Sequence, residues 1–191
     1  LNADSELKYP VRFVGGKREV YLKGEGYFQV SKDSCRQFIV HLQNSEITVL
    51  GTAFNVSAYE DEAHVYTTLE EGRVAFYSRQ NKQRILLKPG MQSDMEVATG
   101  KTVVSEVDPS LYSAWIEGRF VFQSLDLESI LRQLQRWYDF ELFYADPDVK
   151  EMHFTIDILK YEEISKVLNL MERMNKVKFT QKGRTVVVNS Y

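Results

Sequence analysis

Apolar and polar residues alternate through the first half of the chain. From Val11 to about Val107 almost every apolar run has a period of two, the spacing of a strand with one buried face. The runs "EVYLKG", "YFQV", "FIVHL", "ITVL", "FNVSAY", "VAFY" and "RILL" are rich in β-branched and aromatic residues, which suit pleated surfaces. No helical period precedes residue 108. The pattern predicts an all-β domain over residues 1–107.

A weak repeat within this domain indicates how its strands are arranged. Three segments begin with a small residue, at Gly26, Thr52 and Gly72, and continue with alternating apolar positions. They recur roughly every 20–25 residues, which is within the range of solenoid repeats. A small residue at a corner lets the backbone bend and directs the following residues into a shared core. A solenoid-like stack and a sandwich of short strands both fit this pattern.

The period changes at Asp108-Pro109. The segment "VDPSLYSAWIEG" predicts a short helical connector over residues 108–118, with Asp108 as its N-cap and Gly118 at its end. The connector contains one tryptophan, Trp115, and a tryptophan is usually a core residue. An aromatic side chain at a domain junction can also hold one domain against the other, so we regard Trp115 as a candidate interdomain residue.

Strand and helix patterns alternate after the connector. Leu127, Ile130, Leu131 and Leu134 follow the i, i+3, i+4, i+7 spacing of an amphipathic helix, with Asp126 or Ser124 as its cap. A second helix, "YEEISKVLNLMERMN", lies between the strand runs "HFTIDI" and "KVKFTQ". The order β-α-β, β-α-β-β predicts a small α+β domain over residues 119–191, with two helices packed on one face of a sheet.

Composition and charge exclude several function classes. The chain has 191 residues, of which 43% are hydrophobic and 27% charged, as in ordinary folded proteins. Its formal net charge of -3 gives no electrostatic footprint for nucleic acid. Cys35 is the only cysteine, which excludes an internal disulfide and a cysteine-based zinc site. No run approaches the roughly 20 apolar residues that span a bilayer.

The sequence contains no conventional catalytic motif. His41, His64 and His153 have no metal-ligand spacing, so we expect neither a metal nor a cofactor. The acidic pair Glu70-Glu71 is typical of a surface corner, although glycosidases also use two carboxylates for catalysis. Phosphate-binding, nucleophile-elbow and dinucleotide fingerprints are missing from the sequence. We therefore expect a binding protein and not an enzyme.

Several ordered motifs resemble those of one family. "YPVRF", "REVYLKGEGYFQV", "FIVHLQNSEITVLGTAFNVSAYED", "TTLEEGRVAF" and "LKPGMQ" are similar, in this order, to the motifs of FecR-type anti-sigma regulators. "YSAWIEGRFVFQSLDLESILRQLQRWYDFEL" is similar to the segment that follows them in the family. Gly26 departs from the family pattern, which usually has alanine there. Residues 1–107 then look like the FecR domain, and residues 119–191 look like the small secretin/TonB N-terminal-type domain that closes this architecture.

The resemblance implies a role in signalling across the cell envelope. It implies that a TonB-dependent outer-membrane transporter contacts the regulator through its signalling domain when loaded with substrate, and that an extracytoplasmic-function sigma factor is then freed or activated. The sequence opens within a family motif, so we expect the transmembrane helix and the cytoplasmic part that binds the sigma factor to lie upstream. These residues would be the periplasmic part of a single-pass inner-membrane protein, with no nucleic acid partner.

The resemblance also gives the pair Gly51-Thr52 a candidate reaction. Some family members cleave themselves at this Gly-Thr bond, the threonine hydroxyl attacking the glycine carbonyl. Such a step needs a base, and Asn55, His41 or His64 could serve only if the fold brings one of them near. The alternative, which we favour, is that Gly51 is a structural corner or bulge and Thr52 an ordinary strand residue.

Two further hypotheses concern binding surfaces. The run Thr185, Val186, Val187, Val188, Asn189 carries no charge, so it is a candidate free sheet edge that accepts a partner strand, unless it is an internal strand that is already paired. A carbohydrate-binding or adhesive β module is the alternative function, with Tyr27 or Tyr59 as an aromatic platform for sugars.

Overall fold

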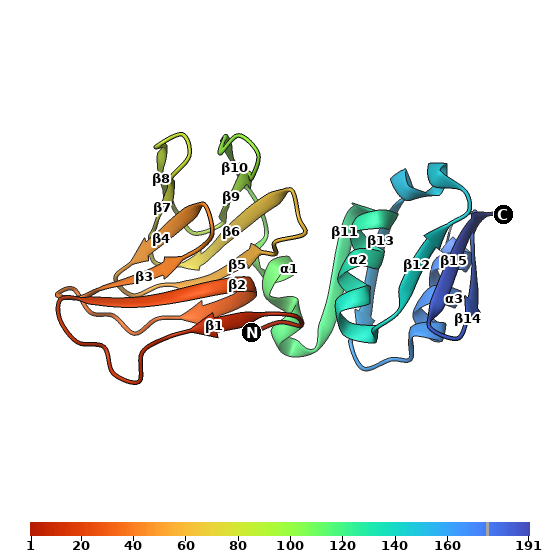
Figure 1. The fold of residues 1–191 in the computed structure, drawn as a ribbon, viewed down its shortest axis with the longest axis horizontal. Helices are drawn as coiled ribbons and strands as arrows, with labels where there is room; N and C mark the ends of the chain where they lie inside the picture. The colour runs from red at the N-terminus through yellow and green to blue at the C-terminus, as the bar shows by residue number, and fades with distance from the viewer. Residues whose placement is uncertain (175) are drawn as a thin grey trace. The chain divides into compact units, whose positions relative to one another are not determined.

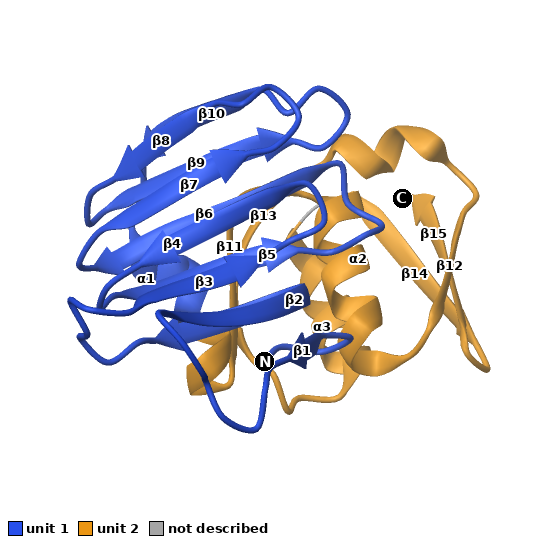
Figure 2. Ribbon diagram, turned by 60° about the vertical axis from the view of Figure 1, so that its left-hand side comes forward, with its two compact units in different colours: residues 1–113 blue, residues 114–191 orange. Residues whose placement is uncertain are grey.

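The computed structural model describes residues 1–174 and 176–191, and their contacts divide the chain into two compact units. The first unit comprises residues 1–113 and the second residues 114–191 (Figure 2). The division falls inside the segment 108–118, where the sequence predicts a connector. Each unit has its own cluster of buried apolar side chains. None of the helices in the described ranges has the length and apolar character needed to cross a membrane.

The first unit consists of strands up to its last residues, as the alternation predicts. Its elements are β1 (Glu6–Lys8), β2 (Lys17–Gln29), β3 (Gln37–His41), β4 (Ser45–Val49), β5 (Ala53–Ala58), β6 (His64–Glu71), β7 (Val74–Ser78), β8 (Arg84–Leu87), β9 (Met91–Glu96), β10 (Thr102–Glu106) and the short helix α1 (Pro109–Ser113). The strands form one ten-stranded sheet in the order β10-β9-β6-β5-β2-β3-β4-β7-β8, with β1 paired to β2.

Strand β2 belongs to both halves of this sheet, which curls around it (Figure 1). Residues 17–21 of β2 pair with β3 in parallel, whereas residues 24–29 pair with β5 in antiparallel orientation. The change occurs at Gly24, which has a φ of 82° and would place a Cβ 2.9 Å from the carbonyl oxygen of Asp4. Glycine adopts this backbone conformation without the steric cost that a side chain would add.

The solenoid alternative is therefore wrong, since the neighbouring strands of this sheet are mostly antiparallel, whereas the stacked repeats of a solenoid place equivalent strands in parallel. Gly26 is also not a corner, because it lies inside β2 opposite Val56 of β5. Alternation identifies which residues face the core, but it does not say which strands become neighbours.

A single core lies between the two halves of the curled sheet. Val40, Ile47 and Phe76 enter it from the half that contains β3, β4 and β7, and each is fully buried. Phe54 and Leu69 enter it from β5 and β6 and are equally buried. The ring of Phe54 stacks on that of Phe28 with a centroid distance of 5.2 Å. The apolar positions of the alternating pattern thus meet in one place, because the sheet closes over them.

The second unit has the predicted order of strands and helices. Its elements are the 3-10 helix η1 (Ala114–Glu117), β11 (Arg119–Asp126), α2 (Leu127–Tyr138), β12 (Glu141–Tyr144), the 3-10 helix η2 (Pro147–Glu151), β13 (His153–Leu159), α3 (Ile164–Met174), β14 (Val177–Lys182) and β15 (Thr185–Ser190). Asp126 caps α2, because its carboxylate accepts a hydrogen bond of 2.8 Å from the amide of Ser129.

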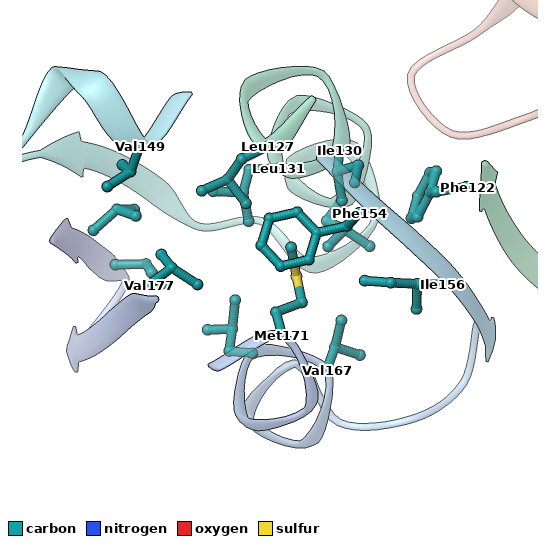
Figure 3. Close-up of a cluster of buried hydrophobic side chains, with 14 of the residues drawn as sticks. Phe122, Leu127, Ile130, Leu131, Val149, Phe154, Ile156, Val167, Met171 and Val177 are labelled. Carbon is teal, nitrogen blue, oxygen red and sulfur yellow. The ribbon is translucent and has the colours of Figure 1, made fainter. Parts of the chain in front are cut away.

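The predicted single sheet is wrong in this unit. Strands β11 and β13 form an antiparallel pair, while β12, β15 and β14 form a separate three-stranded sheet. Figure 3 shows the core between them: Leu127 and Ile130 from α2 and Val167 and Met171 from α3 converge with Phe154 of β13. In this view the helices lie on opposite sides of the cluster, not on one face of a sheet.

The stacked pair in the first core provides a direct test of its closure. We predict that Phe54→Ala lowers the free energy of unfolding of the first unit by about 3–5 kcal/mol, because it removes a fully buried ring and leaves a cavity. Denaturant unfolding followed by circular dichroism measures the change. Leu86→Ala on β8 is the control, since Leu86 is 75% exposed. Equal losses for both variants would contradict a core closed around Phe54.

Candidate functional site

The pair Gly51-Thr52 lies where the chain crosses between the two halves of the curled sheet. Strand β4, before the pair, belongs to one half, and β5, after it, belongs to the other. The chain crosses back between β6 and β7, at Gly72 and Arg73. This position explains why a β-branched residue follows Gly51 directly: the segment is a crossover between sheet halves and not a hairpin turn.

The two crossovers pack against each other through glycine backbone. Gly51 has a φ of 157°, and a Cβ there would lie 2.6 Å from the Cα atom of Lys32. Gly72 has a φ of 93°, and its Cβ would lie 2.7 Å from the carbonyl oxygen of Gly51. A side chain at either position would require the neighbouring backbone to move. Both glycines are therefore required by close approach as well as by backbone conformation.

The hydroxyl of Thr52 joins the two crossovers. Its Oγ1 donates a hydrogen bond of 3.0 Å to the carbonyl oxygen of Arg73 and is 3.4 Å from the amide nitrogen of Arg73, which donates to it. The backbone of Thr52 also pairs with that of Val30 just beyond β2, at 3.0 and 3.2 Å. Thr52 is only 4% exposed, so these bonds are shielded from water. We call this arrangement of Gly51, Thr52, Gly72 and Arg73 the crossover lock.

The candidate bases for self-cleavage have their contacts elsewhere. In the described ranges, both hydrogen bonds found for Thr52 Oγ1 run to the backbone of Arg73. A backbone carbonyl accepts a hydrogen bond but does not take up the proton as a general base does. The partners of the three candidates include Glu25 for Asn55, Arg79 for His41 and Asp94 for His64, at 2.7, 2.9 and 2.6 Å. The geometry fits the structural-corner interpretation of this pair.

Trp115 contacts a lysine of its own unit. Lys160 is 8% exposed, and its Nζ lies 3.3 Å from the ring centroid of Trp137 and 5.8 Å from that of Trp115. Its Nζ is also 3.5 Å from the carbonyl oxygen of Trp115. A buried ammonium group between two aromatic faces gains cation–π attraction in place of hydration. The role of Trp115 between the two domains stays a prediction.

The segment Thr185–Asn189 is not a free sheet edge. It forms most of β15, which pairs in parallel with β12 on one side and in antiparallel orientation with β14 on the other. Its backbone groups are therefore engaged, and the proposal that it accepts a partner strand is wrong. The run lacks charges because it is the central strand, with Val186 and Val188 fully buried.

The two tyrosines proposed as a sugar platform are also engaged. Tyr59 is 7% exposed and donates a hydrogen bond of 2.9 Å to the carbonyl oxygen of Ala3, so its ring is not a surface platform. Tyr27 is half-buried and donates to a carboxylate oxygen of Glu70 at 3.0 Å. Burial, with help from Glu70, raises the pKa of Tyr27 to about 12. The carbohydrate-binding alternative gains no support from these positions.

Among residues 1–174 and 176–191, no group of three or more His, Cys, Asp or Glu side chains is arranged to hold a metal ion. The sequence indicates that Gly72 is a corner, but its packing against Gly51 is visible only in the structure. The signal in the sequence was the pattern that the segments at Thr52 and Gly72 share, a small residue followed by alternating apolar positions. Lys160 was missed entirely, because nothing in its local sequence marks it as buried.

Comparisons with known proteins agree with the motifs. Residues 1–75 match the family model described as "FecR protein", and residues 119–188 match the one described as "FecR, C-terminal". Two crystal structures of a candidate anti-sigma factor from Parabacteroides distasonis ATCC 8503 are similar in fold, with TM-scores of 0.91 and 0.89. Both are 24% identical in sequence, and the matches cover 100% of this chain and 89% and 88% of theirs. None of the curated proteins matches the sequence.

Because of the crossover lock, we predict that replacing glycine by alanine destabilises the protein at Gly72 but not at an open position such as Gly16. We expect Gly72→Ala to lower the free energy of unfolding by roughly 2–4 kcal/mol, since it adds steric overlap to a disfavoured φ. Gly16→Ala is the matched control, because a Cβ there meets nothing within 4 Å. Denaturant unfolding of both variants measures the difference. A Gly72→Ala protein as stable as the control would show that the two crossovers are not tightly packed.

Proposed function

The chain belongs to the FecR family of anti-sigma factors, and from this premise we propose that residues 1–191 are the signal-receiving part of a transmembrane regulator. Membership of an anti-sigma family implies a sigma factor as partner. In our proposal these residues lie in the periplasm, as part of a single-pass inner-membrane protein. The signalling domain of a TonB-dependent outer-membrane transporter binds them when the transporter is loaded. A cytoplasmic part outside these residues then frees or activates an extracytoplasmic-function sigma factor.

One observation carries this proposal: both units match FecR models, in the order in which the motifs of the family occur. The first unit contains the crossover motifs "VLGT" and "TLEEG", and the second contains the segment that follows them. A receiver of this kind needs a rigid scaffold and a surface that another protein can contact. Two units, each with its own packed core, fit that requirement.

We also propose that this chain acts by binding and that the Gly51-Thr52 bond stays intact. The support is the hydrogen bonding of Thr52, whose hydroxyl proton is directed at the carbonyl oxygen of Arg73. To act as a nucleophile, the hydroxyl would have to leave that acceptor and give its proton to a base. The buried position of Thr52 also limits the access of water, which would be needed to hydrolyse an ester.

A binding experiment tests the signalling role. We expect the purified chain to bind the signalling domain of its cognate TonB-dependent transporter with a Kd on the order of micromolar, as is typical of transient signalling contacts. Isothermal titration calorimetry measures this affinity. The signalling domain of a transporter from an unrelated gene cluster is the control. Lack of binding, or equal binding to both domains, would contradict the proposal.

Mass spectrometry tests the integrity of the Gly51-Thr52 bond. We expect one species near 22.3 kDa after purification and prolonged incubation, because the hydroxyl of Thr52 donates to a backbone carbonyl, which is not a general base. Thr52→Ala provides the comparison, since it removes the hydroxyl. Two fragments in the original protein, and none in Thr52→Ala, would establish self-cleavage instead.

A further inference from the structure

The connection between β1 and β2, residues 9–16, carries an unusual group of exposed apolar side chains. It projects away from the sheet, at the lower left of Figure 1. Val11 and Val14 are 106% and 85% exposed, and Tyr9 is 66% exposed. Single exposed apolar residues are common on soluble proteins. Three of them within six residues of one projecting loop indicate a surface that something else covers.

The base of this loop is fixed to the sheet, so that its tip is held outward. Phe13 is half-buried, and its ring meets that of Phe38 edge to face at a centroid distance of 6.4 Å. The guanidinium group of Arg18 also contacts Phe38, at 5.6 Å from the ring centroid. It donates hydrogen bonds to the carbonyl oxygens of Ser31 and Arg36, at 3.3 and 3.1 Å. Phe13 thus anchors the loop, while the valines on either side of it remain exposed.

The charge of this segment is of one sign. From residue 8 to residue 18 every charged side chain is a cation, namely Lys8, Arg12, Lys17 and Arg18, although the formal net charge of the chain is -3. Lys8 forms an ion pair of 3.2 Å with Glu6 of β1, so Arg12 and Lys17 are the cations that the loop itself offers. Arg12 lies between the two exposed valines, and Lys17 follows the loop directly. Apolar side chains at a tip and cations beside them are complementary to a surface that presents anions above a hydrocarbon layer.

We propose that residues 9–16 bind the surface of an anionic lipid bilayer. Val11 and Val14 enter the interface between headgroups and acyl chains, and Arg12 and Lys17 contact the lipid phosphates. A membrane fits better than a peptide, because the feature is a convex loop and neither a groove nor a sheet edge. The inference is independent of the transporter, since it requires only this loop and lipid.

Vesicle sedimentation tests this inference with the whole chain. The probes are vesicles of phosphatidylcholine with about 30% phosphatidylglycerol, and vesicles of phosphatidylcholine alone. We expect the chain to sediment with the anionic vesicles, and the bound fraction to fall as salt screens the cations. The double variant Val11→Asp, Val14→Asp should lower the partition coefficient at least about tenfold, because it removes apolar burial and adds repulsion.

A matched control separates this loop from general surface hydrophobicity. Leu86→Asp, Val103→Asp changes two residues that are 75% and 57% exposed on strands β8 and β10, and it should bind vesicles as the original chain does. Circular dichroism establishes that all variants are folded. Failure of the original chain to sediment with anionic vesicles would overturn the proposal, as would equal binding by the loop variant. A concentration-dependent dimer that only the loop variant loses, without vesicle binding, would assign the loop to a second copy instead.

Discussion

The first unit depends on the close approach of two crossovers in one curled sheet. Each crossover carries the chain from one half of the sheet to the other, and each has a glycine where it meets its neighbour. The hydroxyl of Thr52 forms hydrogen bonds with the carbonyl oxygen and the amide of Arg73. It therefore satisfies backbone groups of the crossover by a side-chain contact. If the crossovers were further apart, the two halves of the sheet could not close over Phe54 and Phe76. The core therefore depends on two positions without side chains.

This constraint gives the family motifs a physical meaning. Of the four residues in the "VLGT" motif, Val49 is buried in the core, Gly51 permits the approach of Lys32, and Thr52 bonds across to the second crossover. The glycine of "TLEEG" accommodates the carbonyl oxygen of Gly51. The two motifs are about twenty residues apart in sequence but are complementary parts of one contact. A change in either of them alters the environment of the other.

The sequence predicts the local structure of this protein better than its long-range contacts. Period-two alternation locates the strands of the first unit, and the spacing of Leu127, Ile130 and Leu134 locates α2, because these patterns reflect which side is buried. The partners of a strand are decided by contacts between distant segments. The free edge assigned to Thr185–Asn189 failed for this reason: an uncharged strand can be an unprotected edge or a buried centre, and only the pairing distinguishes the two. The position of Lys160 between two tryptophans is likewise invisible to local sequence.

Structural and chemical roles are both compatible with the residue types at Gly51-Thr52. A glycine followed by a threonine hydroxyl is what an acyl shift requires, but it is also what a tightly packed crossover requires, so residue identity cannot distinguish the two. The distinction lies in the acceptor of the hydroxyl proton. Here it is a backbone carbonyl, which stabilises the proton on oxygen through a hydrogen bond and does not remove it. A family could therefore gain or lose cleavage at a fixed glycine-threonine pair by moving one acceptor, while the sheet around it stays the same.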